Sequence, residues 1–112
     1  MKRLLLGALP LLIAGSSFAG DVGPPPPCFE TVGCVSDRKI SERDAEKLGC
    51  EQLWTVRNSI YHARGYCFRT ARGREAFGNA GCQYDDEAEV PLNDYERANI
   101  RLIRSIEKRR GC

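Results

Sequence analysis

Residues 92–110 read LNDYERANIRLIRSIEKRR and carry the clearest helix signals of the chain. Asn93 can cap a helix, and Glu96 follows at the capping-box position. Isoleucines at three-residue steps lie on one face of such a helix, and the basic residues at its end suit the negative end of the helix dipole. The apolar stripe consists of Ile100, Ile103 and Ile106. The sequence therefore predicts an amphipathic helix over residues 94–110.

A second amphipathic helix is predicted over residues 51–64. Its apolar residues recur at steps of three and four, and Gly65 supplies the left-handed turn that ends it. The apolar residues are Leu53, Trp54, Val56, Ile60 and Tyr61. Two helices that each carry one apolar face bury those faces by packing together, and we expect these two to pack antiparallel.

Shorter elements fill the rest of the domain. Ser41 is a good cap for a helix over residues 42–48, and Thr70 is a good cap for a helix over residues 71–77. Residues 66–68 form a brief extended turn between the helices. The predicted fold class is therefore mainly α: a small disulfide-stabilised helical domain with two longer antiparallel helices, short helices and a brief extended turn.

The chain contains six cysteines, and an even number in a small exported domain indicates a disulfide framework. Antiparallel packing brings the start of the helix over 51–64 beside the end of the helix over 94–110, which pairs the cysteines at those ends. Two further cysteines flank the short helix over 71–77, and the remaining two close a small local loop. The predicted pairs are Cys50–Cys112, Cys67–Cys82 and Cys28–Cys34.

The N-terminus has the features of a secretory signal peptide over residues 1–19. Two basic residues precede a short apolar run, and small residues up to Ala19 form the cleavage site. The run is much shorter than the roughly 20 residues that span a bilayer. Residues 20–39 form a Pro-rich leader with a small cysteine loop, and residues 40–112 form the domain. We expect a secreted or periplasmic protein with no membrane span.

The charge balance argues against nucleic acid as a partner. Cleavage after Ala19 removes two of the 17 basic residues and none of the 15 acidic ones, so the mature chain carries 15 of each. A formally neutral chain has no excess charge with which to attract a polyanion. We expect a monomer that binds no nucleic acid.

Catalytic and metal-binding residue sets are not apparent in the sequence. His62 is the single histidine, and no Cys-x-x-Cys pair accompanies it at zinc-site spacing. Nucleophilic catalysis would need a free nucleophile, a base and an orienting group. We therefore expect no enzyme activity, no metal and no cofactor.

Four segments resemble one known family. LWTVRNSIY, GYCF, AFGN and YERANIRLI keep the order and spacing of the YARHG domain, a small bacterial domain assigned to the outside of the cell. The resemblance covers residues 40–112. It implies a fold and an extracellular location, and no biochemical activity is established for the family.

The chain departs from the family signature at one point. The signature reads Tyr-Ala-Arg-His-Gly, whereas residues 61–65 read Tyr-His-Ala-Arg-Gly. A shift of two positions turns a helical side chain by about 200° to the opposite face, so a catalytic histidine would not survive it. We expect His62 to be a surface residue. The residues that keep their family positions are Arg57, Asn58, Tyr61, Gly65 and Tyr66.

Three classes of function remain open. The first is a cell-envelope binding module that recognises a cell-wall glycan or an anionic surface component through basic and aromatic side chains. The second is a periplasmic protein that binds or inhibits another protein, and the third is a purely structural scaffold. The candidate binding residues of the module are Arg57, Tyr61, Arg64, Tyr66 and Arg69, with Trp54, Arg72 and Arg74 as further candidates.

One contact between the long helices follows from the predicted register. If Cys50 meets Cys112, residue 64 lies almost level with residue 98, and Arg64 can reach Glu96. The sequence therefore predicts an Arg64–Glu96 ion pair with Tyr61 packed between the helices.

Overall fold

The structure is a computed structural model that describes residues 26–112. Its elements, in chain order, are β1 (Cys28–Phe29), β2 (Gly33–Cys34), α1 (Glu42–Ala45), α2 (Cys50–Ala63), α3 (Ala71–Phe77), the 3₁₀ helix η2 (Glu87–Glu89) and α4 (Asp94–Arg110). The predicted signal peptide and residues 20–25 of the leader lie outside the described residues. Within the described part, no helix has the length and apolar character to span a bilayer. The predicted mainly α fold class is confirmed.

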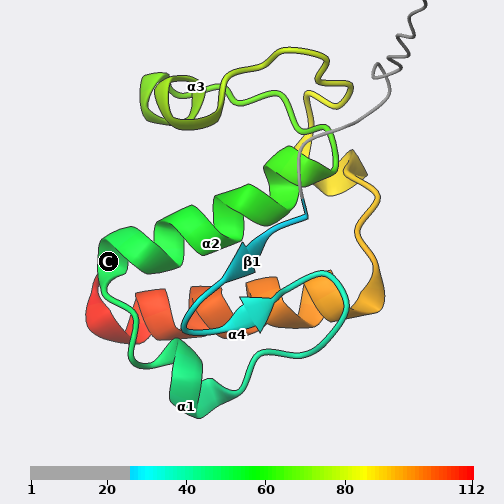
Figure 1. The fold of residues 1–112 in the computed structure, drawn as a ribbon. Coiled ribbons are helices and arrows are strands. Elements are labelled where there is room, and N and C mark those ends of the chain that lie inside the picture. Colours follow the sequence, from blue (N-terminus) through cyan, green and yellow to red (C-terminus); the bar gives the residue numbers. More distant parts are fainter. Residues whose placement is uncertain (1–25) are drawn as a thin grey trace, which may run out of the picture.

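The two long helices, α2 and α4, form the frame of the fold (Figure 1). A disulfide between Cys50 and Cys112 joins the start of α2 to the end of α4. At the opposite ends, Arg64 pairs with Glu96 at 2.9 Å. These two links place the helices side by side and antiparallel, as predicted. The Asn93 cap and the capping box with Glu96 are also present at the start of α4.

The segment before α1 lies against α4. Strands β1 and β2 pair antiparallel with Cys28 opposite Cys34, and these two cysteines form a disulfide. Downstream of the hairpin, the buried amide of Asn99 bonds three backbone groups of the segment 35–40 at 2.8–2.9 Å. A buried amide with all these bonds made is stable where it is, and it fixes the path of the segment across α4.

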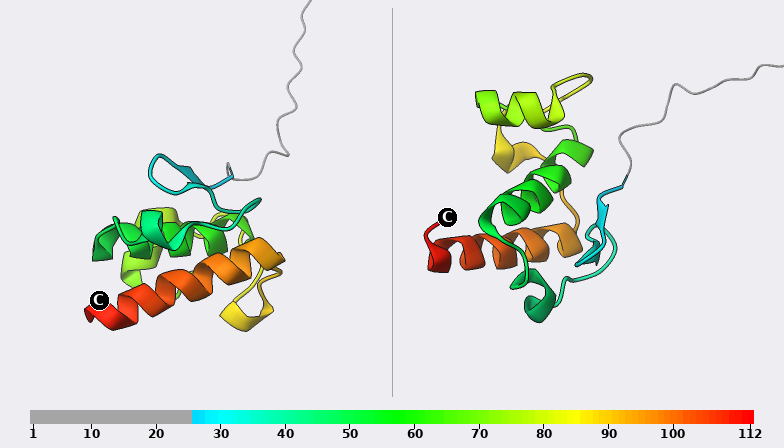
Figure 2. Two further views of the ribbon diagram at one scale, coloured as in Figure 1. Left: turned by 90° about the horizontal axis from the view of Figure 1, so that it is seen from below. Right: turned by 60° about the vertical axis from the view of Figure 1, so that its left-hand side comes forward.

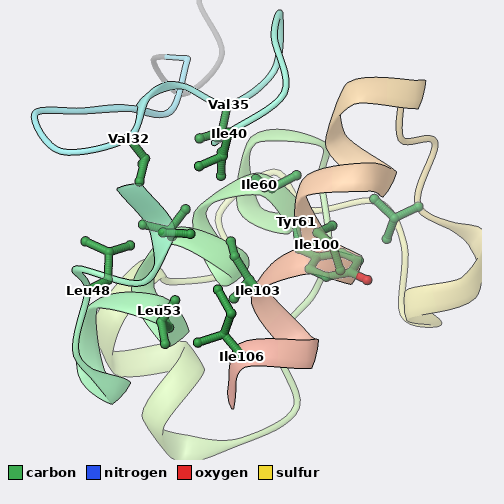
Figure 3. Close-up of a cluster of buried hydrophobic side chains, with 13 residues drawn as sticks. Val32, Val35, Ile40, Leu48, Leu53, Ile60, Tyr61, Ile100, Ile103 and Ile106 are labelled. Carbon is green, nitrogen blue, oxygen red and sulfur yellow. The ribbon is translucent and has the colours of Figure 1, made fainter. Parts of the chain in front are cut away.

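The hydrophobic core lies between α2, α4 and the N-terminal segment (Figure 3). The isoleucines of α4 face α2 and are at most 4% exposed. The other buried side chains of this cluster are Val32, Val35, Ile40, Ala45, Leu48, Leu53, Val56, Ile60, Tyr61 and Val90. Burying one such aliphatic side chain contributes about 2 kcal/mol, so this interface supplies most of the apolar stabilisation of a small domain.

Helix α1 is shorter than predicted, because it ends at Ala45 rather than at residue 48. The backbone tightens there into bonds between residues three apart, and Leu48 turns into the core. From the end of α4, the guanidinium of Arg110 donates to the carbonyl oxygens of Glu46 and Leu48. A side chain more than 60 residues away thus satisfies two carbonyl groups in the turn that follows α1.

Helix α3 lies on the side of α2 that faces away from α4 (Figures 1 and 2). It spans the predicted residues, and Thr70 caps it by accepting a bond from the backbone N–H of Gly73. Gly73 is buried against Phe68, and a Cβ atom built on it would lie 2.7 Å from Cδ1 of that ring. The disulfide between Cys67 and Cys82 closes the segment that carries α3, so all three pairs are those predicted.

Candidate functional site

The turn that follows α2 pairs with a glycine-rich loop. Gly65 has a φ of +92°, and its carbonyl oxygen accepts bonds from the backbone N–H groups of Gln83 and Tyr84 at 2.7 and 3.0 Å. The N–H of Cys67 donates to the carbonyl oxygen of Tyr84 at 2.8 Å. The Cys67–Cys82 disulfide locks the same two segments together. The signature residues therefore form one wall of a rigid two-segment structure.

A cavity of about 410 Å³ lies between these two segments, and we call it the signature pocket. Its lining residues are His62, Ala63, Arg64, Gly65, Tyr66, Gly78, Ala80, Gly81, Cys82, Gln83, Tyr84 and Pro91. Among these lining residues two are basic and none is acidic. The volume is in the range that binds small molecules or single sugar units.

Arg64 supplies the strongest charge of the signature pocket. Its Nε–H group donates to both carboxylate oxygens of Glu96, at 2.9 and 3.0 Å. The two terminal Nη groups make no hydrogen bond to any residue in the described part of the chain, and the side chain is 38% exposed. The Nε edge of the Arg64 guanidinium is thus fixed by Glu96, whereas the Nη edge has no hydrogen-bond partner within the described residues.

Glu96 is the anchor for Arg64, and its side chain is fully buried. Beside the bonds from Arg64, it accepts a bond from the Ser36 hydroxyl at 2.6 Å and from the backbone N–H of Asn93 at 2.8 Å. A buried carboxylate needs a counter-charge and several donors, and this one has both. Its position is therefore fixed by three separate segments of the chain.

Arg57 has a different environment from Arg64. Its Nε and Nη2 atoms donate to the two oxygens of Glu107 at 2.8 and 3.0 Å, as a two-bond pair across the α2–α4 interface. Both side chains are largely buried, at 18% and 13% exposed. Arg57 is therefore occupied by a contact inside the fold, although the sequence made it a candidate binding residue.

The other candidate residues lie in three different places. Tyr61 is buried at 5% exposure between α2 and α4, close to Ile100 (Figure 3). Tyr66 lines the signature pocket, and its ring packs against the ring of Tyr61 with centroids 5.7 Å apart. Arg69 is exposed before α3 and does not line the signature pocket. Only Arg64 and Tyr66 of the five are brought together in one cavity.

Burial raises the pKa of the Tyr61 hydroxyl above its ordinary value of 10.0. The carboxylate of Glu87 raises this pKa further, whereas the guanidinium groups of Arg104 and Arg57 lower it. Arg104 also pairs with Glu87 at 2.7 Å, which ties the 3₁₀ helix η2 to α4. Tyr61 therefore belongs to the core of the fold and does not line the signature pocket.

His62 is half-buried and packed against aromatic rings, which the sequence did not predict. Its ring centroid lies 5.2 Å from that of Phe77 and 6.3 Å from that of Phe68. Its imidazole makes no hydrogen bond within the described residues. The expected surface position is therefore only partly right, because α3 folds back over this face of α2.

Trp54 and Arg72 form a separate stack on the outside of α2. The guanidinium carbon of Arg72 lies 3.8 Å from the centre of the Trp54 ring, and Arg72 also pairs with Glu51 at 2.6 Å. The centroid of the Trp54 ring also lies 5.8 Å from that of Phe77. This stack joins α3 to α2, in agreement with a packing role.

Several residues of the signature pocket were not identified from the sequence. Gly78 and Gly81 have positive φ values, and a Cβ built on either would meet nothing within 4 Å, so this wall is open. The ring of Tyr84 lies 3.5 Å from the Cβ position of Gly65. The glycines at positions 78 and 81 indicate a turn, but nothing local in the sequence places this turn opposite the end of α2.

The described residues contain no group of three or more potential metal-ligating side chains. All six cysteines are paired in three disulfides, and no free cysteine remains. Disulfides persist outside the reducing cytoplasm, so this arrangement is typical of an extracytoplasmic domain.

Comparison with known proteins gives one match. The model of the YARHG domain matches residues 30–108, which include the segment 35–40 that is bound to α4. No curated protein and no solved structure shows a significant match to the chain. The match covers well over half of the 112 residues and includes every helix that builds the signature pocket. The chain therefore belongs to the YARHG domain family.

Proposed function

We propose that this domain is an exported, non-catalytic binding module of the bacterial cell envelope, and that it binds its ligand in the signature pocket. The observation that carries the proposal is that Arg64, whose Nη groups make no hydrogen bond within the described residues, lines a cavity whose lining residues include no acidic side chain. A guanidinium held by a buried carboxylate is pre-organised, so it loses little conformational freedom when a ligand binds.

The other arginines chosen from the sequence support this assignment by contrast. Arg57 is occupied by Glu107, and Arg72 is occupied by Trp54 and Glu51. Arg64 is the arginine that combines a fixed position, partial burial and free donors. Aromatic rings of Tyr66 and Tyr84 line the same cavity and offer the flat apolar faces on which sugars stack.

The location of the protein agrees with an envelope ligand. The sequence predicts a signal peptide over residues 1–19, and the three disulfides fit an oxidising compartment. In a periplasm or at a cell surface, the most abundant immobile ligand is the cell wall.

Co-sedimentation with purified peptidoglycan sacculi tests the proposal. The mature chain should pellet with sacculi, and Arg64→Lys should reduce the bound fraction at least tenfold, because a lysine lacks the planar pair of donors. Arg69→Lys is the matched control, since Arg69 lies outside the pocket, and it should bind as the wild type does. No retention of the folded wild-type protein, or equal loss in both variants, would refute the proposal.

A further inference from the structure

We infer that the signature pocket recognises a carboxylate group, which binds end-on to the two Nη atoms of Arg64. This inference rests on the proposed function and names the chemical group that the pocket would take from the cell wall. The ligand class is a carboxylate-bearing glycan or glycopeptide rather than a phosphate-bearing polymer.

The donors that remain on Arg64 match a carboxylate. A guanidinium carries five N–H donors, and the single Nε–H group is shared between the two oxygens of Glu96. The four remaining donors are on Nη1 and Nη2, in one plane. Two parallel bonds from these atoms fit the two oxygens of one carboxylate.

The pocket is poorly equipped for a phosphate. A phosphate group carries up to two negative charges and three acceptor oxygens, and protein sites for it usually combine several cations or a nest of free backbone N–H groups. Here Arg64 and Glu96 together carry no net charge, so the site offers directional N–H donors rather than the excess positive charge that a doubly charged phosphate needs. In the loop that lines the pocket, the N–H groups of Gly78, Cys82, Gln83 and Tyr84 are bonded to backbone carbonyl oxygens, which leaves only those of Ala80 and Gly81.

The anchoring of Glu96 gives the free edge a fixed direction. Its oxygens are bonded to the Ser36 hydroxyl and to the Asn93 N–H group as well as to Arg64, so the carboxylate cannot follow the guanidinium if that moves. Fixing a binding group from behind is the arrangement that a specific site requires. His62, whose imidazole has no hydrogen-bond partner in residues 26–112, lines the same cavity as a second donor.

The walls beside Arg64 are suited to the neutral part of such a ligand. The side chains of Tyr66, Tyr84 and Pro91 are uncharged, and the glycine-rich wall is open. Cell-wall glycan strands carry carboxylates on a lactyl ether of the sugar and on the attached peptides. A sugar face on a tyrosine ring with its carboxylate on Arg64 would use both parts of the pocket.

The test compares native sacculi with sacculi whose carboxyl groups have been converted to amides by carbodiimide and ammonia. We expect the wild-type protein to pellet with native sacculi and to lose at least ten-fold in affinity for the amidated ones. In solution, N-acetylmuramic acid should shift the side-chain Nε–Hε NMR signal of Arg64, whereas N-acetylglucosamine, which lacks the lactyl carboxylate, should not.

Two alanines supply a matched pair of variants. Ala80 is exposed and lines the pocket, whereas Ala76 is exposed on α3 outside it. Ala80→Glu places a competing carboxylate near Arg64 and should abolish binding to native sacculi, while Ala76→Glu should leave it unchanged. Both variants should keep the wild-type melting temperature to within a few degrees.

The outcomes separate the two proposals. Equal binding to native and amidated sacculi overturns the carboxylate inference and leaves the envelope module in place. Binding to neither form by the folded protein overturns the envelope module, and the NMR titration then decides the carboxylate inference alone. An Ala80→Glu variant that binds native sacculi as well as Ala76→Glu does would also overturn the carboxylate inference.

Discussion

Removal of the Cys50–Cys112 disulfide should destabilise the domain more than removal of either other disulfide. This cross-link joins residues 62 apart, whereas the other two join residues 15 and 6 apart. In the loop-closure model, a cross-link removes entropy from the unfolded chain in proportion to the logarithm of the loop length. The expected losses are about 4 kcal/mol for the longest loop, about 3 kcal/mol for the middle one and about 2 kcal/mol for the shortest.

In this structure the effect of the Cys50–Cys112 cross-link can be measured without a change in core packing. Cys50 and Cys112 are exposed, so replacing both with alanine removes the cross-link without opening a cavity in the core. The Arg57–Glu107 pair still holds α2 against α4 in that variant. A loss of about 4 kcal/mol should lower the melting temperature of a domain of this size by about 20 °C.

The assay is guanidinium unfolding of three double-alanine variants, followed by circular dichroism at 222 nm. The free energies of unfolding should fall in the order of the loop lengths, and the dependence on denaturant should steepen most in the variant without the longest loop, because its unfolded chain exposes more surface. Equal losses for all three variants, or the largest loss for the Cys28–Cys34 variant, would show that loop closure is not the source of the stabilisation.

Three further predictions concern single positions. Gly73→Ala should lower the free energy of unfolding, measured by chemical denaturation, by about 1–2 kcal/mol, because the new Cβ would press on Phe68. Alanine normally favours a helix over glycine, so a stabilised variant would contradict this packing. Asn99→Ala should cost about 3 kcal/mol by the same measurement, since it leaves buried backbone groups of the segment 35–40 without partners. Because the pKa of the Tyr61 hydroxyl is raised on folding, the protein should lose stability as the pH rises above about 10. Thermal melts at pH 9 and 11 should show a smaller alkaline loss for Tyr61→Phe than for the wild type, and equal losses would disprove the shift.

The long helices and the disulfide pairs could be predicted because their signals are local. The cap at Asn93, the isoleucine stripe of α4 and the stop at Gly65 each depend on residues within a few positions. Once both helices are placed, the antiparallel arrangement brings Cys50 to Cys112 and Arg64 to Glu96. Such pairings need only helix length and register.

The remaining features depend on contacts between residues far apart in the sequence. The turn after α1 is bonded by Arg110 from about 60 residues away, and the role of Asn99 follows from a segment about 60 residues before it. His62 is half-buried because α3 folds back against it. Gly81 lies opposite the end of α2 because the Cys67–Cys82 disulfide holds the two segments together. In each of these contacts the two partners are far apart in the sequence, so local sequence patterns do not reveal them.

The polar contacts of α4 also set the order in which the chain can assemble. Ser36, the segment 35–40 and the end of α1 all complete their bonds on residues of α4, and α2 buries its apolar face there. A chain that emerges from a ribosome or a translocation channel with its N-terminus first therefore has no partner for these groups until the final helix appears. The Cys28–Cys34 hairpin and the Cys67–Cys82 loop can close earlier, because both cysteines of each pair precede α4. Packing of the hydrophobic core is then a late event, because α1, α2 and the segment 35–40 all need α4 to complete their contacts.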